Sequence, residues 1–511
     1  MRGSVKAALF FGVGLLSARA LASDFVDTRL TFLVSDEDVL VAPGQTSPSI
    51  PGVHVGFPTS QNLQFYDNFN TKYTGFENLS NLTLYKSTPT FFPGLDAEAA
   101  LVLTLLDYGS YVNIQDQSSY IRLHYTPSGW DAKKEGFFLT LFPTSSDRMR
   151  LGFSYRISWG GDAVFPQGGP PVSGPLLPTT PSPGAKIEFY RGNGYAWIGA
   201  KGTELLDPKL NEPEVNYGIL GGAGYDVLPT FRAEFNAAYF SQGGNPDTSV
   251  LSAPVWVGGA SGRLTYHRGA PVGTSIDFAL YRNDPLIQER FFVPEEYPGG
   301  LSYSFSLEGT YTRQALADPD VTGTTTTYPA AAGAFWARMK YDMLRAWFLA
   351  EYRDLSFIEM NQAGYIPYNV YPSGAKVTPE IFGAIGADYH FPRPHLTPGL
   401  VLGLENPSSF TSQFALSGNN PPLGLTGTHT VVIYNQGDTS VLPPGSGETL
   451  VFSSKATCKW DISDAFAAVG EVYFVVDNDR TTFFNGTSGL AEPVFQKPYE
   501  LGFNAVLQAR F

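Results

Sequence analysis

The chain has 511 residues, of which 43% are hydrophobic and only 16% are charged. Soluble proteins are typically about one quarter charged, so this composition favours a protein with an apolar exterior, such as a barrel that faces lipid. The formal net charge of −14 argues against nucleic acid as a partner, because binding phosphates requires a basic face. The single cysteine, Cys458, excludes an intrachain disulfide and a cysteine metal cluster.

Residues 1–22 have the pattern of a signal peptide. Arg2 and Lys6 precede the apolar run 7–16, and Ala20-Leu21-Ala22 follows as a cleavage site. The run is too short for a spanning helix, which needs about 20 residues, and no later stretch supplies one. We therefore expect 1–22 to be removed and 23–511 to form one domain, with its first strand beginning near residue 25.

Further along the chain, apolar and polar residues alternate with a period of two, which is typical of strands. Ile121, Leu123 and Tyr125 alternate with Arg122 and His124. The most regular alternation covers residues 148–159, where the arginines fall on one face and the large apolar residues on the other. A helix would mix these two sets, so we predict that 148–159 is a strand of the wall.

Short turns, such as 143–147, alternate with long connections rich in glycine and proline at 35–74, 160–184 and 406–447. This asymmetry is expected of periplasmic turns and extracellular loops. The stretch 160–184 cannot pair within a central strand. It is expected either to fold into the lumen as a constriction or to project outward.

Alternation continues at 231–239 and 301–308, and the longer segments approach the roughly 9 to 11 residues of a tilted transmembrane strand. Counting such segments gives roughly 18 to 20 strands, rounded to an even number as in single-chain bacterial barrels.

The last strand, 499–511, places alternate apolar residues on one face and ends on an aromatic residue. The positions of interest are Phe503, Leu507, Ala509 and Phe511. This ending resembles that of the Gram-negative outer-membrane β-barrels, the porin-like superfamily, in which the barrel-assembly machinery recognises it. The resemblance implies an all-β fold: one large antiparallel transmembrane β-barrel with long extracellular loops, in contact with outer-membrane lipid and lipopolysaccharide.

If the apolar residues face lipid, the alternate positions face the lumen and are candidates for lining a pore: Arg122, Arg148, Arg150, Arg156, Arg232, Glu234 and Glu308. Such charges can set up a field that selects solutes. Alternatively, opposite charges on neighbouring strands pair and fill the lumen. Because three arginines share one face of 148–159, that row is the best candidate for a selectivity ladder.

The sequence thus predicts a porin-like passive solute channel of the outer membrane. One alternative is a structural or adhesive barrel of an envelope-spanning assembly, such as a gliding-motility complex, that contacts envelope proteins through its long loops. The other is a hydrolase at the barrel rim. The sequence has six histidines but neither G-x-S-x-G nor H-E-x-x-H, so we predict no enzyme, no catalytic residue, no cofactor and no metal site.

Overall fold

The computed structural model describes most of the chain after residue 25. The described residues are 26–36, 40, 77–107, 112–116, 119–132, 134–143, 149–154, 157–160, 164–165, 182–206, 213–244, 253–270, 300–318, 321–360, 374–413, 427–435, 438–485 and 491–510. The expected signal peptide, 1–22, lies outside them.

A single antiparallel sheet of nineteen strands dominates the described part of the chain. Its members are β1 (Val26–Asp36), β2 (Glu77–Pro89), β3 (Leu95–Asp107), β4 (Val112–Asp116), β5 (Tyr120–Tyr125), β6 (Gly136–Phe142), β7 (Gly184–Arg191), β8 (Gly194–Leu206), β9 (Pro213–Leu228), β10 (Phe231–Gly244), β11 (Pro254–Arg268), β12 (Leu301–Ala317), β13 (Thr325–Tyr341), β14 (Leu344–Arg353), β16 (Glu380–Tyr389), β17 (Leu396–Asn406), β21 (Val451–Ser463), β22 (Phe466–Val476) and β25 (Tyr499–Arg510).

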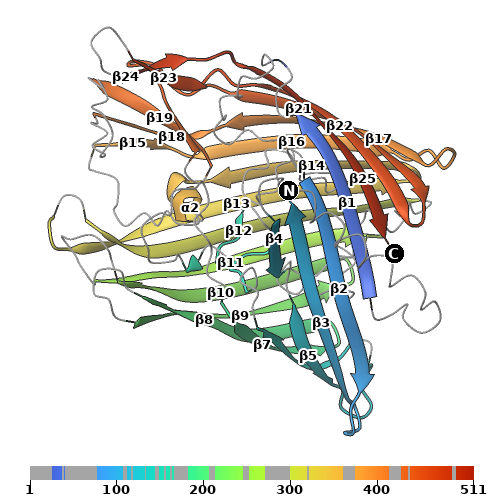
Figure 1. The fold of residues 1–511 in the computed structure, drawn as a ribbon. Coiled ribbons are helices and arrows are strands. Elements are labelled where there is room, and N and C mark those ends of the chain that lie inside the picture. The colour runs from blue at the N-terminus through green and yellow to red at the C-terminus, as the bar shows by residue number, and fades with distance from the viewer. Residues whose placement is uncertain are drawn as a thin grey trace, which may run out of the picture.

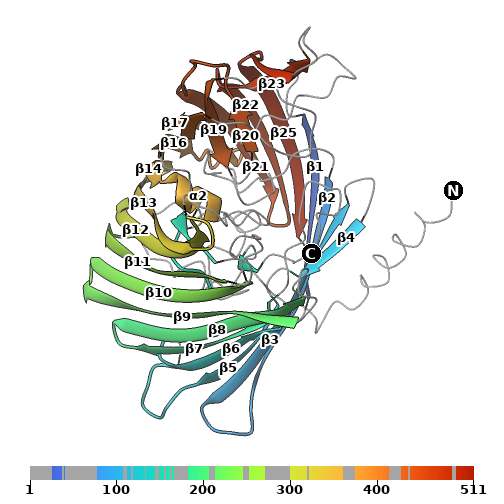
Figure 2. The same ribbon diagram turned by 90° about the vertical axis from the view of Figure 1, so that its left-hand side faces the viewer.

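Eighteen of the nineteen strands form a ring. Each wall strand pairs with the next along the chain, and β4 pairs only with β3. The last strand, β25, pairs with both β22 and β1, and β1 pairs with β2. The order of neighbours therefore returns to its start, which confirms an antiparallel barrel with a strand number in the predicted range (Figures 1 and 2).

Smaller elements lie in the long connections. The strands β15 (Lys376–Thr378), β18 (Ser408–Gln413), β19 (Thr428–Asn435) and β20 (Asp438–Val441) form a four-stranded sheet, and β23 (Thr481–Asn485) pairs with β24 (Ala491–Phe495). The short helix α2 (Leu355–Met360) follows β14. Figure 2 shows α2 inside the ring, beside β12 and β13. Among the described residues, no helix is long and apolar enough to cross a membrane.

The two rims of the barrel differ in the length of their connections. One rim, here called the short-turn rim, carries the turns 192–193, 229–230, 342–343 and 464–465. The opposite, long-loop rim carries the connections 37–76, 143–183, 354–379 and 407–450. This is the asymmetry between periplasmic and extracellular ends of such barrels. The connection 269–300 departs from the pattern, since it is long but leaves from the short-turn rim.

The alternation of side chains follows the prediction in the wall strands. On β12, Leu301, Phe305 and Leu307 are exposed on the outside, whereas Ser302 and Glu308 are buried on the inside. On β25, Leu507 is exposed outward while Glu500 is buried. Because the exposed row of each strand is largely apolar, the exterior matches a lipid-facing band.

Aromatic side chains mark both edges of this band. Near the long-loop rim, Tyr239 lies between Tyr217 and Trp256, with ring centroids 6.4 and 6.1 Å away. Near the short-turn rim, Tyr266 and Tyr303 lie 6.1 Å apart. Tyrosine and tryptophan prefer the interface between lipid and water. These two groups therefore indicate where the bilayer begins and ends.

The prediction that residues 148–159 form a wall strand was wrong, because the described residues of this range, 149–154 and 157–159, belong to none of the strands of the sheet. The range belongs to the connection between β6 and β7, and Met149 has a positive φ of 60° that no strand residue adopts. Leu151 and Trp159 form one isolated bridge between themselves. The large apolar residues are buried against the inside of the barrel instead of facing lipid, so burial in a protein interior produced the same apolar alternation.

Depth in the bilayer gives a test of this architecture. Leu307 and Leu301 both face outward on β12, but Leu301 is at the short-turn end. Replacing Leu307 with Arg should destabilise the barrel by about 2–4 kcal/mol, whereas Leu301→Arg should cost about 0–1 kcal/mol, because the cost falls toward the interface. Reversible unfolding of each variant from lipid vesicles measures both. Equal costs for the two variants would contradict the assigned depth.

Candidate channel interior

An inner segment, residues 149–154 and 157–165 where described, lies against the inside of the wall. It closes on itself through Leu151 and Trp159, whose backbone amides and carbonyls exchange hydrogen bonds of 2.7 and 2.8 Å. Glycines of the wall make room for it: a Cβ on Gly199 of β8 would lie 2.6 Å from the sulfur of Met149. Within the segment, Gly160 has a φ of 101°, and an added Cβ would meet the Phe240 ring at 2.7 Å. The close fit depends on these glycines.

Aromatic packing holds the middle of the inner segment. The rings of Trp159 and Phe240 meet edge to face with centroids 4.8 Å apart, an arrangement that favours aromatic pairs. Both residues are fully buried in one core cluster with Phe357 and Met360 of α2. The indole Nε1 of Trp159 donates to the carbonyl oxygen of Met360 at 2.7 Å. The segment therefore links β10 to the helix from the next long connection.

Glu308 of β12 fixes one end of the inner segment. Its Oε1 accepts hydrogen bonds from the backbone amides of Phe153, at 2.7 Å, and Ser154, at 3.1 Å, and its Oε2 accepts from the Ser154 hydroxyl at 2.5 Å. Beside it, Asn236 of β10 accepts from the Gly152 amide at 3.1 Å and donates to the Gly152 carbonyl at 3.2 Å. Hydrogen bonds to a charged group contribute about 1.5–3 kcal/mol, so Glu308 is a strong anchor.

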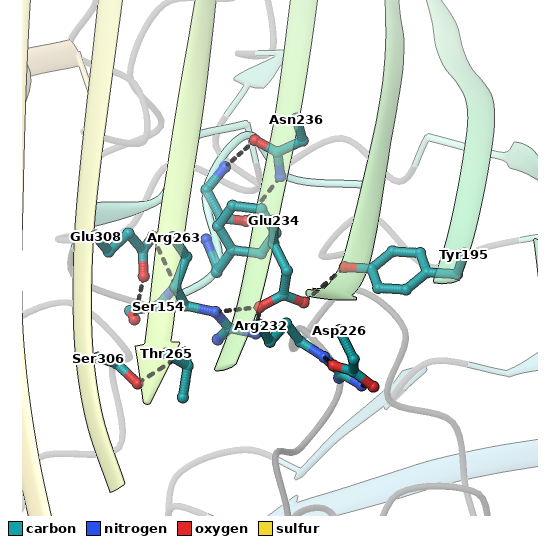
Figure 3. A network of polar contacts seen from close by, with 12 residues as sticks. Ser154, Tyr195, Asp226, Arg232, Glu234, Asn236, Arg263, Thr265, Ser306 and Glu308 are labelled. Atoms are coloured by element: carbon teal, nitrogen blue, oxygen red, sulfur yellow. Dashed lines mark hydrogen bonds and ion pairs between the residues drawn. The ribbon is translucent and has the colours of Figure 1, made fainter. Parts of the chain in front are cut away.

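A polar network continues along the wall from this anchor (Figure 3). Arg263 of β11 lies 4.8 Å above the Phe153 ring and forms an ion pair with Glu234 of β10, with its Nη2 2.6 Å from Oε2. The hydroxyl of Tyr195 donates to Glu234 Oε1 at 2.7 Å. Arg232, two residues earlier on β10, pairs through its Nε with Asp226 Oδ1 at 2.5 Å. Both carboxylates thus have cationic partners on the wall.

The same pairing of charges recurs elsewhere on the inner wall. Arg122 lies 3.7 Å from Glu98 and 3.9 Å from Glu188, with its guanidinium 4.1 Å from the centroid of the Phe138 ring. On the opposite wall the buried pairs are Arg345–Asp388, Arg353–Glu380 and Lys455–Glu471, at 2.7, 2.7 and 3.1 Å. A buried ion needs such a partner, because desolvation costs several kcal/mol. The described lumen is therefore a mosaic of opposite charges.

The candidate pore-lining residues are distributed differently from the prediction. Arg122, Arg232, Glu234 and Glu308 lie on inward positions of wall strands. Arg150 belongs to the inner segment, where it is buried and donates from Nε to the Ser158 hydroxyl at 2.9 Å. Arg148 and Arg156 lie outside the described residues. Since the described residues 149–154 and 157–159 are not part of a wall strand, Arg150 does not lie on a strand face of the wall as the predicted ladder required.

The helix α2 is capped by Asp354. Its Oδ1 accepts from the amide of Phe357 at 2.7 Å, and its Oδ2 accepts from the amide of Ala331 on β13 at 2.6 Å. The first bond satisfies a free N–H at the helix start, and the second ties the helix to the wall. Burial raises the pKa of Asp354 to about 6, against the opposing effect of these two hydrogen bonds.

The histidines considered for a hydrolase have other partners. Rings of His124 and His390 lie 3.0 and 2.9 Å from the hydroxyls of Thr126 and Thr397. The His429 ring contacts the carbonyl of Gly427 at 3.3 Å, and His54 lies outside the described residues. Within the described ranges there is no group of three or more His, Cys, Asp or Glu residues that could hold a metal ion.

The residues of the predicted assembly signal lie on β25, the strand that closes the ring. Leu507 is exposed on the outside, Phe503 is partly buried and Ala509 is buried. Phe511 lies outside the described residues. The pairing of Leu507 with Phe32 of β1 and with Ala468 of β22 places this stretch at the seam of the barrel.

No family model matches the chain, and no curated protein sequence matches it either. Solved structures match in fold. OpdL of Pseudomonas aeruginosa is 8% identical, with 96% of this chain and 99% of that chain covered and a TM-score of 0.43. A BenF-like porin from Pseudomonas fluorescens Pf-5 is 7% identical, with 95% and 97% covered and a TM-score of 0.44. The outer membrane protein OprD of Pseudomonas aeruginosa is 9% identical, with 96% of each chain covered and a TM-score of 0.39.

At these identities and scores, the strand pairing of this chain itself establishes its fold. A ring of antiparallel strands with an apolar exterior and aromatic edges is an outer-membrane β-barrel. The fold class and the outer-membrane location expected from the sequence are confirmed.

Several interior residues were not among the predicted pore-lining candidates, including Asn236, Arg263 and Tyr195. Their inward parity on strands β8, β10 and β11 was a usable signal, since Asn236 alternates with Phe235 and Ala237. Met360 gave no such signal, because its role depends on a helix folding back into the ring.

The Glu308 anchor gives a graded test. Glu308→Gln removes the charge behind three hydrogen bonds, so amide exchange of residues 149–160 should accelerate roughly 10- to 100-fold, since each charged bond contributes about 1.5–3 kcal/mol. Ser154→Ala removes only one bond and should give a smaller acceleration. Hydrogen–deuterium exchange with mass spectrometry measures this, with β21 and β22 peptides as internal controls. Unchanged exchange in 149–160 would contradict the anchor.

The Asp354 cap gives a pH test. Its folded pKa of about 6 lies above the unfolded value near 3.9, so its contribution to stability is fully present below pH of about 4 and is lost as the pH rises through about 6. Asp354→Asn removes the charge and leaves one acceptor oxygen where the carboxylate has two, so one of the bonds to Phe357 and Ala331 is lost at every pH. Because the parent alone loses stability as its carboxyl ionises, the stability of the variant relative to the parent should rise by about 1–3 kcal/mol between pH 4.5 and pH 7.5. Denaturant unfolding at both pH values measures this, and a pH-independent difference would refute it.

Proposed function

We propose that the protein is a passive solute channel of the outer membrane, with a lumen narrowed by the inner segment. The observation that carries this proposal is the attachment of the described part of the inner segment to the inner wall through Glu308, Asn236 and Phe240. Barrels of 16 to 18 strands are wide enough to leave an aqueous channel. A segment anchored inside such a ring reduces its bore and sets what passes.

The charge mosaic supports a channel that selects by local geometry. Arginines and carboxylates alternate along the inner wall at β10, β11 and β12, from Arg232 through Glu234 and Arg263 to Glu308. A solute moving past them meets donors and acceptors in turn, which suits polar or zwitterionic molecules better than a strongly charged ion of one sign. Transport of such solutes is the finer part of the proposal.

A structural barrel is the alternative that the interior also permits. The buried clusters around Trp159 and α2 fill part of the ring with close-packed side chains. A barrel that is fully occupied would not conduct, and its long-loop connections would then bind envelope proteins. Contacts with lipopolysaccharide and with the barrel-assembly machinery are expected for the solute channel and for the structural barrel alike.

Conductance measurements distinguish the solute channel from the structural barrel. The purified protein in a planar bilayer should show discrete conductance steps, and Trp159→Ala should enlarge them, because it removes the contact with Phe240 and the bond to Met360. Phe348→Ala is the matched control: this aromatic residue faces outward on β14, so its loss should leave the steps unchanged. Measuring across a salt gradient also gives the ion selectivity. A folded barrel that stays silent in both forms would overturn the channel proposal in favour of the structural one.

A further inference from the structure

A hollow on the exterior wall lies near the short-turn rim, across strands β7 to β10. It has a volume of about 500 Å³, and residues on its lining include Phe189, Arg191, Ala196, Ala223 and Phe235. All five occupy outward positions of their strands. The hollow therefore opens toward lipid, and it also borders the inward-facing Tyr195 and Glu234.

The strand register explains its shape. One row across the wall reads Phe189, Ala196, Ala223 and Phe235 on β7, β8, β9 and β10. Two alanines thus form a floor between two phenylalanines, and the banks stand three strand spacings of about 4.8 Å apart. Phe235 and Ala223 are both exposed, so this floor is accessible from the bilayer. A trough of this width accepts a hydrocarbon chain lying against the wall.

One bank of the trough is reinforced by aromatic residues. Phe189 lies 5.0 Å from Phe137 and 5.9 Å from Trp130, measured between ring centroids. Trp130 comes from the turn 126–135, which Glu135 ties to the next turn by accepting from the Gly192 amide at 2.8 Å. Packing between neighbouring turns therefore makes this bank firm.

A cationic side chain lies at the end of the trough that is nearest the short-turn rim. Arg191 is exposed at the end of β7, and its guanidinium lies 4.6 Å above the centroid of the Trp130 ring. Tryptophan marks the depth at which lipid headgroups begin. An arginine at that depth offers a planar pair of donors to a phosphate. Charge is thus placed at the headgroup end of the trough, and apolar surface lies farther into the bilayer.

We infer that this trough is a binding site for an anionic phospholipid, with an acyl chain on Ala196 and Ala223 and the phosphate at Arg191. Each cationic side chain beside a bilayer surface raises the affinity for anionic lipids by about fivefold. The site does not depend on the lumen being open. It assigns the wall from β7 to β10 a partner in the periplasmic leaflet.

The test uses the purified full-length protein in detergent micelles, with phosphatidylglycerol and phosphatidylcholine of the same acyl chains as probes. Native mass spectrometry counts the lipid retained by each protein molecule. The parent should retain phosphatidylglycerol about fivefold better than phosphatidylcholine. Arg191→Gln should abolish this headgroup preference while keeping some binding of both lipids.

The floor is tested with Ala196→Leu and Ala223→Leu together, which fill the trough and should reduce retention of both lipids. Ala456→Leu is the matched control, because Ala456 is an exposed outward alanine of β21 between Leu400 and Val472. It should bind as the parent does. Equal retention of the two headgroups by the parent, unchanged retention after filling the floor, or a lipid-free dimer that covers β7 to β10 would each overturn the inference. Conductance is unaffected by these outcomes, so failure here leaves the channel proposal standing.

Discussion

Lipid offers no hydrogen-bonding partner to a peptide group, and every strand edge left open in a bilayer costs several kcal/mol per unsatisfied group. In this protein the pairing of β25 with β1 closes the ring of eighteen strands. The ring depends on that seam, since it joins the two ends of the described chain over eight residue pairs from Arg29–Arg510 to Asp36–Phe503. The apolar exterior and the polar interior both follow from closure. In a closed ring, one face of every strand contacts lipid and the other face contacts the lumen.

Closure also decides the chemistry of the interior. Once apolar residues face lipid, the alternate positions place many ionisable groups in a confined space. Ion pairing between neighbouring strands, such as Arg353 with Glu380, removes most of the cost of burying them. The inner segment then uses what remains: Glu308 accepts from its backbone, and Phe240 packs on Trp159. Interior anchoring and any selection of solutes therefore depend on the same groups.

The apolar exterior of the barrel is not uniform in shape. Between β7 and β10 it is hollowed by alanines and bordered by aromatic rings, and Arg191 stands at its rim. Elsewhere, as on β12, large side chains such as Leu307 cover the wall. A local hollow with a charged end gives lipid a preferred place on an otherwise non-specific surface.

The sequence by itself determined the wall. A period of two is a local property of a strand, so rows such as Leu301, Phe305 and Leu307 could be assigned to one face without knowing their neighbours. The inner segment was decided only by the tertiary structure. Met149, Leu151 and Trp159 alternate with arginines like a wall strand, but burial inside a ring and burial in lipid demand the same apolar residues. Which of the two applies depends on contacts with Gly199, Phe240 and Glu308, which lie about 50 to 155 residues away along the chain and come close only when the ring has formed.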